Sequence, residues 1–101
     1  MPKLHKSKIR EAFRSDCMKR DNEKCVLCAT YNKTSAKNLE VHHITNRKQM
    51  PNGGYVKQNG ITLCPRHHLK VETDMYSYPP SRLYELIASS YEEALDASQR
   101  L

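Results

Sequence analysis

The sequence predicts a small α+β domain that is stapled by a structural metal ion and flanked by a helix at each end. Two ligand pairs, Cys25-x-x-Cys28 and Cys64-x-x-His67, predict the metal site. Short apolar segments between turn signals predict a pair of strands, and apolar residues at helical spacing predict the flanking helices. At 101 residues, the chain is expected to form a single domain over residues 1–101.

The composition explains why a metal is needed. Only 38% of the residues are hydrophobic, Trp is absent and Phe13 is the single phenylalanine. A core this thin usually requires disulfides or a structural metal. Residues 1–10 are polar and Lys-rich rather than an apolar leader, so the four cysteines favour metal binding in a reducing compartment. We expect a cytoplasmic protein without a membrane span, since no apolar run is long enough. A phage or mobile-element origin is left open.

The charge of the chain is positive and unevenly distributed. The net charge is +6, and residues 1–24 carry eight Lys or Arg against four Asp or Glu. Residues 25–72 carry seven against two, whereas residues 73–101 carry two against five. The basic surplus therefore lies with the metal-ligand residues, and a polyanion such as DNA is the expected partner. The alternative is a solvated basic surface without a ligand.

Residues 1–24 are expected to form a basic N-terminal helix and the turn that ends it. From residue 7 to residue 20, Ile9, Phe13 and Cys17 recur at helical spacing while Lys and Arg fill the other faces. A lone thiol on such a stripe is typical of a buried small hydrophobe, so Cys17 is not expected to be a ligand. Residues 21–24 end the helix and lead into Cys25.

The middle of the chain, residues 25–73, is expected to hold the strands and the metal ligands. After a polar loop over residues 29–38, residues 39–44 alternate at first between apolar and polar side chains, which predicts a short strand. Asn52-Gly53-Gly54 predicts a turn, followed by a second extended segment near Tyr55 and Val56. Residues 58–60 form another turn, residues 61–63 lead into Cys64, and a short helix is expected to run to about Thr73.

Residues 79–99 are expected to form one C-terminal helix after the two prolines, capped by Ser81. Its apolar residues recur at i, i+3 and i+4 spacing, and its other faces are acidic. This helix either covers the small metal domain, docks a larger protein partner, or pairs with a second copy as a homodimer. The sequence leaves these alternatives open.

The two ligand pairs predict a closed tetrahedral zinc site. Four N and S ligands with no vacant position are typical of structural zinc. A two-Cys, two-His finger would need histidines several residues apart, whereas His42 and His43 are adjacent. A redox pair would need a βαβ context, and a zinc deaminase would need His-x-Glu before Pro-Cys-x-x-Cys. The predicted zinc ligands are Cys25, Cys28, Cys64 and His67.

Three histidines in the same region remain after zinc is assigned: His42, His43 and His68. Neighbouring residues on a strand point to opposite sides, so one member of the pair can hold a cation while the other faces a different reactant. His42 and His68 could build a second, open metal site. His43 would then be a free imidazole with a pKa near neutrality, suited to taking a proton from water. The alternative is that these histidines are surplus zinc ligands or surface residues.

Three stretches of this region resemble the HNH endonucleases of the ββα-metal class: Glu40-Val41-His42-His43-Ile44, Asn59-Gly60-Ile61-Thr62-Leu63-Cys64, and Cys64-x-x-His67-His68. Cys25-x-x-Cys28 and the preceding Arg20-Asp21 are similar to the zinc-stapled branch. The resemblance covers roughly residues 14–72. The second zinc pair is usually Cys-x-x-Cys in that branch, so His67 is a departure, although histidine is also a zinc ligand.

The resemblance implies a role for each position of the motif. His42 and His68 are expected to bind the catalytic cation, and His43 to act as the general base. Asn59 is expected to brace the two strands and the loop bearing the base. Glu72 stands where some members have a further histidine, so it is a candidate third cation ligand. Glu40 could assist instead.

The function implied is a metal-dependent DNA endonuclease or nickase that leaves 5′-phosphate and 3′-hydroxyl ends. The catalytic divalent cation, such as Mg²⁺, Mn²⁺ or Ni²⁺, is left open, as is the choice between nicking and double-strand cutting. The runner-up is a non-catalytic zinc module that binds nucleic acid. Four basic residues near the motif could hold neighbouring phosphates: Arg47, Lys48, Arg66 and Lys70.

Overall fold

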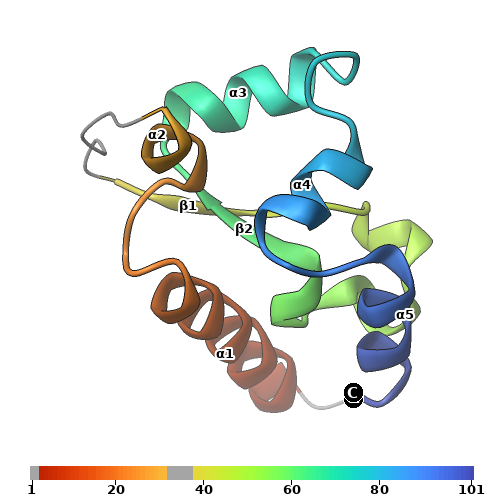
Figure 1. Cartoon of the computed structure of the whole chain (residues 1–101). Helices are drawn as coiled ribbons and strands as arrows, with labels where there is room; N and C mark the ends of the chain where they lie inside the picture. The colour runs from red at the N-terminus through yellow and green to blue at the C-terminus, as the bar shows by residue number, and fades with distance from the viewer. Residues whose placement is uncertain (1–2, 32–37) are drawn as a thin grey trace.

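A pair of short strands lies between helices from both ends of the chain (Figure 1). The computed structural model describes residues 3–31 and 38–101. Residues 32–37 of the expected polar loop, and residues 1–2 of the basic N-terminal segment, lie outside the described residues. Within them the elements follow in the order α1 (Lys3–Arg20), α2 (Val26–Thr30), β1 (Glu40–His43), η1 (Arg47–Gln49), η2 (Pro51–Gly54), η3 (Lys57–Asn59), β2 (Gly60–Leu63), α3 (Pro65–Thr73), α4 (Pro80–Leu86) and α5 (Tyr91–Gln99).

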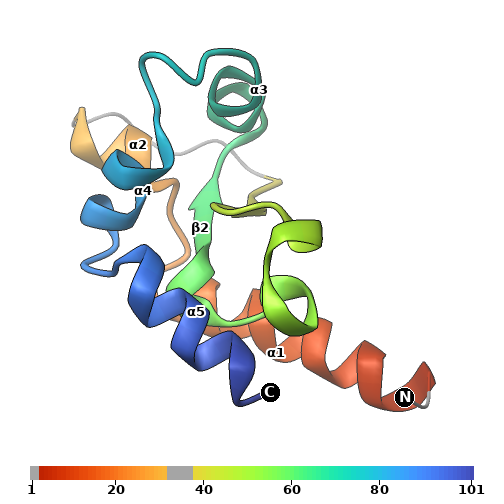
Figure 2. The same ribbon diagram turned by 90° about the vertical axis from the view of Figure 1, so that its right-hand side faces the viewer.

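The two strands pair in antiparallel register, with Glu40 opposite Leu63 and His43 opposite Gly60. Strand β2 is buried along its whole length, whereas β1 is partly exposed. Helices α1 and α3 lie on opposite sides of the pair (Figures 1 and 2). Because strand side chains alternate, the adjacent histidines of β1 can reach different helices.

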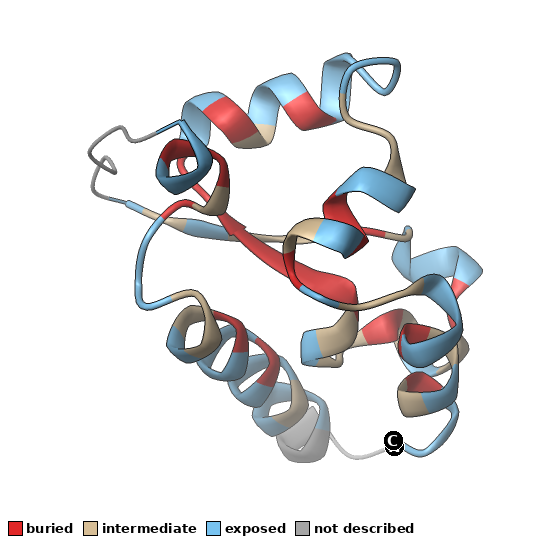
Figure 3. Ribbon diagram, in the orientation of Figure 1, coloured by how far each residue is buried: buried red, intermediate tan, exposed pale blue. Residues whose placement is uncertain are grey.

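Helix α1 packs on β2 through Phe13 and Cys17, which are both buried, while most of the other residues of the helix whose burial is described are exposed (Figure 3). Gly60 makes this approach possible. A Cβ at Gly60 would lie 2.5 Å from the Cys17 sulfur and 2.6 Å from a Phe13 ring carbon, so a larger residue would push the helix away. The predicted helix and the buried position of Cys17 are therefore confirmed.

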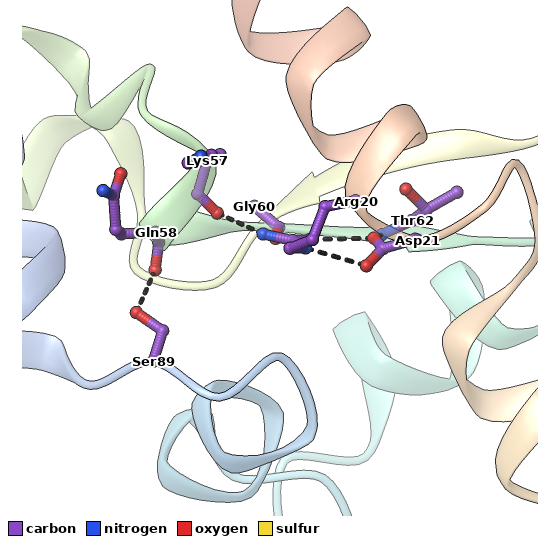
Figure 4. Close-up of polar contacts among 7 residues, drawn as sticks. All are labelled: Arg20, Asp21, Lys57, Gln58, Gly60, Thr62 and Ser89. Carbon is purple, nitrogen blue, oxygen red and sulfur yellow. Dashed lines mark hydrogen bonds and ion pairs between the residues drawn. The ribbon is translucent and has the colours of Figure 1, made fainter.

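Arg20 and Asp21, at the end of α1, form an ion pair whose further hydrogen bonds hold the helix end against β2. Both carboxylate oxygens of Asp21 accept hydrogen bonds from Arg20 at 2.8 Å (Figure 4). Arg20 also donates to the carbonyls of Lys57 and Gly60, at 2.5 and 2.6 Å, and Asp21 accepts from the backbone N–H of Thr62 at 3.0 Å. The pair thus holds the helix end, η3 and β2 in one arrangement.

Two helices, not one, form the C-terminal part, so the prediction of a single helix over residues 79–99 is wrong. Residues 87–90 separate α4 from α5. Ala88 has φ +53°, and the N–H groups of Ala88 and Ser89 donate to the carbonyls of Glu85 and Tyr84 at 3.0 and 2.9 Å. These bonds form a Schellman helix end, in which glycine is the usual residue at the position of Ala88. Because alanine stands where glycine is usual, no glycine in the sequence marks the break between α4 and α5.

The helix caps also differ from expectation. Helix α4 begins at Pro80 and has no side-chain cap, while Ser90, rather than Ser81, caps α5 by accepting a backbone hydrogen bond. Both helices pack on the core through buried residues, namely Leu83, Tyr84, Ile87, Ala94 and Ser98.

Two hydrogen bonds join this helix pair to the connection between the strands. The Ser89 hydroxyl donates to the Gln58 carbonyl at 3.0 Å (Figure 4), and the Asn52 side chain donates to the Ser98 carbonyl at 2.9 Å. The C-terminal helices therefore cover the metal domain, as one of the three alternatives expected. A larger protein partner or a homodimer through this region stays a prediction.

The α+β fold class is confirmed, with one strand misplaced. The second strand is Gly60–Leu63, whereas Tyr55 and Val56 lie between two 3-10 helices. The predicted turn at residues 52–54 is present, with Asn52 and Gly53 at positive φ. In the described part of the chain, no helix combines the length and the hydrophobicity needed to span a bilayer.

Candidate metal centres and the cleft between them

The four predicted zinc ligands meet at one buried point. Cys25 and Cys28 belong to the start of α2, and Cys64 and His67 to the start of α3. The Nδ1 atom of His67 lies 3.4 Å from each of the three sulfurs, and the sulfurs of Cys28 and Cys64 are 3.8 Å apart. All four ligand atoms lie within 4.8 Å of one another.

These distances fit a tetrahedral zinc ion. With Zn–S bonds of about 2.3 Å and Zn–N bonds of about 2.0 Å, tetrahedral geometry places two sulfurs about 3.8 Å apart and sulfur and nitrogen about 3.5 Å apart. Each leading cysteine also caps its helix, since Cys25 accepts from the N–H of Cys28 and Cys64 from the N–H of His67. The cluster is therefore suited to a structural zinc ion.

A second set of possible ligands lies on the α3 side of the strands. The rings of His42 and His68 are 5.1 Å apart between centroids, and ligand atoms of His42, His68 and Glu72 lie within 4.8 Å of one another. Burial, followed by the proximity of His68, lowers the pKa of His42 to about 4. A neutral imidazole is the form that binds metals. Two imidazoles and one carboxylate leave further positions open on a cation.

Carboxylates contact both ring nitrogens of His68. Nδ1 lies 2.7 Å from Glu40 on β1, and Nε2 lies 2.6 Å from Glu72, one helical turn later on α3. A ligating histidine commonly donates its other N–H to a carboxylate, which fixes the tautomer and the ring orientation. Glu40 can serve in this way, leaving Nε2 and Glu72 for a cation. The contact between Glu40 and His68 thus gives a geometric basis for the expectation that Glu40 could assist the cation site.

His43 faces the opposite side of the strands and is enclosed by aromatic rings. Its ring stacks on Phe13 of α1 at 4.6 Å between centroids and meets the Tyr55 ring edge-on at 4.7 Å. Its Nε2 atom is buried and has no hydrogen-bond partner among the described residues. A doubly protonated ring would leave that N–H unsatisfied, which disfavours the charged form.

The pKa of His43 is lowered to about 4, first by burial and then by the charges of Arg47 and His42. The sequence-based expectation of a pKa near neutrality is therefore wrong. The physical reason is the enclosure by Phe13 and Tyr55, which come from other elements and remove water from the ring. At neutral pH the imidazole is uncharged and already able to accept a proton.

Asn59 is fully buried and lies between the end of β1 and the start of β2. Its Oδ1 accepts from the N–H of Thr45 at 2.9 Å and from the Tyr84 hydroxyl at 2.7 Å. Its Nδ2 donates to the carbonyls of Thr45 and Gly54 at 3.1 and 3.2 Å. The bracing contacts expected of this asparagine are present, and they use both amide hydrogens and both acceptor positions.

Tyr84 completes this network from α4. Besides donating to Asn59, its oxygen lies 2.6 Å from the Thr45 hydroxyl, which must then be the donor. Burial raises the pKa of Tyr84 even though the bond to Thr45 opposes the rise, so the phenol stays protonated. The sequence carried no signal for this residue, because the contact joins positions 25 residues apart.

A cleft of about 680 Å³ opens over the second set of ligands. His42, His43, His68 and Glu72 are all among the residues that line it. Of the four predicted phosphate-binding residues, the exposed Arg47 and Lys48 lie on its wall. Arg66 and Lys70 are exposed on α3 but do not line the cleft, and their role stays a prediction.

Comparison with known proteins assigns the region that contains both ligand sets. Residues 25–74, about half of the chain, match the family model described as HNH endonuclease. That interval holds every predicted zinc ligand, both strands and the second set of ligands. No curated protein and no solved structure matches the chain significantly. The chain belongs to the HNH endonuclease family, whose model matches residues 25–74.

Proposed function

We propose that this protein is a metal-dependent DNA endonuclease or nickase that hydrolyses phosphodiester bonds. The observation that carries the proposal is the convergence of His42, His68 and Glu72 in an open cleft that His43 also lines. If the imidazoles of His42 and His68 pointed away from each other, only the alternative function, a zinc-stapled binding module, would be supported. Their ligand atoms instead lie within reach of one ion.

Two metal ions are required by the proposal, with different tasks. Cys25, Cys28, Cys64 and His67 would hold zinc, which fixes α2 against α3. His42, His68 and Glu72 would hold a divalent cation such as Mg²⁺, Mn²⁺ or Ni²⁺. Mg²⁺ would favour the Glu72 oxygen, and Ni²⁺ would favour the two imidazoles. When bound, this cation would neutralise charge on the phosphate and on the departing 3′-oxygen.

The protein's own groups supply the remaining chemistry. His43, uncharged at neutral pH, takes a proton from the attacking water. Asn59 holds the loop after β1 through Thr45, and with it the positions of His43 and of the Arg47 and Lys48 side chains. Those two cations bind phosphates beside the scissile bond, which adds affinity without reading sequence.

The assay that tests the proposal uses zinc-loaded protein and supercoiled plasmid with Mg²⁺, Mn²⁺ or Ni²⁺ in turn. We expect conversion to nicked or linear DNA with at least one cation and none without added cation, as scored on an agarose gel. Binding to the plasmid without any cleavage, with every cation, would favour the alternative of a non-catalytic zinc module. The ratio of nicked to linear product distinguishes a nickase from a double-strand nuclease.

The lowered pKa of His43 gives a further expectation. A base is active in its deprotonated form, so its contribution falls as the pH decreases through its pKa, here about 4. The single-turnover cleavage rate at saturating cation should therefore be nearly level between about pH 6 and 8, where an unperturbed imidazole of pKa about 6.5 would be titrating. A rate that drops by half near pH 6.5, with zinc still bound, would contradict this expectation.

A further inference from the structure

Two arginines from distant parts of the chain meet at the ring beside His43. The Arg10 guanidinium carbon lies 5.5 Å from the centroid of the Tyr55 ring, and Arg47 donates to the Tyr55 hydroxyl at 2.8 Å. The edge-on contact between Tyr55 and His43 places both cations next to the proposed base. A cation over an aromatic face is held in position while most of its N–H donors stay available.

Arg10 is the middle member of a basic row on α1. Lys6, Arg10 and Arg14 stand four residues apart, so they lie on one helix face at intervals of about 6 Å along the axis. All three are exposed and line a shallow hollow on the helix surface, together with Ser7 and Glu11.

Among the described residues, no ion pair neutralises the positive charge of this row. In residues 3–31 and 38–101, Lys6, Arg10 and Arg14 form no ion pair, although Glu11 borders the same hollow. Arg14 makes one hydrogen bond, to the Leu39 carbonyl at 3.2 Å. Like charges at i and i+4 destabilise a helix. An anionic ligand with several charges at regular intervals would remove that repulsion.

The row also leads to the proposed site. Figure 2 shows the N-terminal half of α1 extending below the segment of residues 47–54, which carries Arg47. Lys6, Arg10 and Arg47 therefore form a basic surface that ends at His43. Helix α1 lies outside the interval matched by the HNH family model, so this surface adds to the nuclease domain.

We propose that the sugar–phosphate backbone of the DNA substrate lies along α1, with phosphates at Arg10 and its neighbours Lys6 and Arg14, and passes Tyr55 to reach His43. This proposal rests on the proposed function for the identity of the ligand. Because only phosphates are contacted, the surface contributes affinity and register but no sequence preference.

The test measures binding of a fluorescently labelled DNA duplex by anisotropy, without catalytic cation, over a series of KCl concentrations. For the double variant Arg10→Ala/Arg14→Ala we expect weaker binding and a slope of log K against log salt that is shallower by about 1.8, since each lost phosphate contact removes about 0.9. The matched control is Lys8→Ala/Lys19→Ala, which removes two exposed cations from other faces of the same helix and should change the slope little. Zinc content and circular dichroism confirm that each variant is folded.

Equal slopes in the two double variants, or no binding by the wild-type protein at low salt, would overturn the proposal. The cleavage rate at saturating DNA provides an independent readout, and the control Lys8→Ala/Lys19→Ala should leave it within about twofold of wild type. Failure of the proposed function would look different. In that case the wild-type protein would bind DNA with a salt slope that depends on Arg10, but it would not cleave plasmid with any of the cations.

Discussion

Cys28→Ser is expected to unfold the domain rather than to weaken it slightly. The Cys28 sulfur lies 3.8 Å from that of Cys64 and 3.4 Å from His67 Nδ1, so it closes the proposed zinc site. Structural zinc contributes about 10 kcal/mol or more of apparent binding free energy, and the whole stability of a domain is about 5–15 kcal/mol. Three of the four ligands also belong to the small buried core. Losing the ion therefore removes most of what holds α2 and α3 together.

The measurement is thermal unfolding by circular dichroism, together with zinc content by atomic absorption. Cys17→Ser is the matched control, because Cys17 is also buried but does not belong to the cluster of Cys25, Cys28, Cys64 and His67; burial raises its pKa to about 12. Burying a hydroxyl there should cost about 1–3 kcal/mol without loss of zinc. If Cys28→Ser kept one zinc ion per chain and unfolded cooperatively near the wild-type temperature, the zinc site would not be the staple of this fold.

The cluster of four zinc-capable side chains could be predicted from the sequence because its geometry is local. In each pair the first cysteine caps a helix and the second ligand follows three residues later, so spacing alone brings two ligands together. The opposite orientations of His42 and His43 were predictable for the same reason, since they follow from strand alternation. What spacing did not reveal was how far His43 is buried. That burial depends on Phe13 and Tyr55, which lie outside the strand that carries His43.

The C-terminal region shows the limit of local patterns most clearly. Its apolar residues keep helical spacing through the break between α4 and α5, and Ala88 adopts a left-handed conformation that favours glycine. The break places Tyr84 where it can donate to Asn59, and Ser89 where it can donate to the Gln58 carbonyl. A hydrogen bond between distant residues has no periodic signature. The region that seemed separate from the site in the sequence therefore supports it.

His43→Ala is expected to lower the cleavage rate by about 10²–10⁴-fold, the usual contribution of a general base. The variant should keep its zinc, because His43 lies on the face of β1 turned toward α1, away from the cysteine cluster. DNA binding should be unchanged, since Arg10 and Arg47 contact Tyr55 rather than the imidazole. The loss should thus appear in the rate at saturating DNA and not in the affinity, as measured by single-turnover plasmid cleavage.

His68→Ala provides the contrast that separates a base from a metal ligand. Removing His68 leaves His42 and Glu72 with one ligand fewer, so a higher cation concentration should be needed for half-maximal cleavage. In His43→Ala that concentration should stay as in the wild type, and added imidazole should restore part of the rate by entering the space between Phe13 and Tyr55. Unchanged cleavage by His43→Ala would remove His43 from the mechanism. A raised cation requirement in that variant would instead make His43 a ligand and leave the protein without a base on this strand.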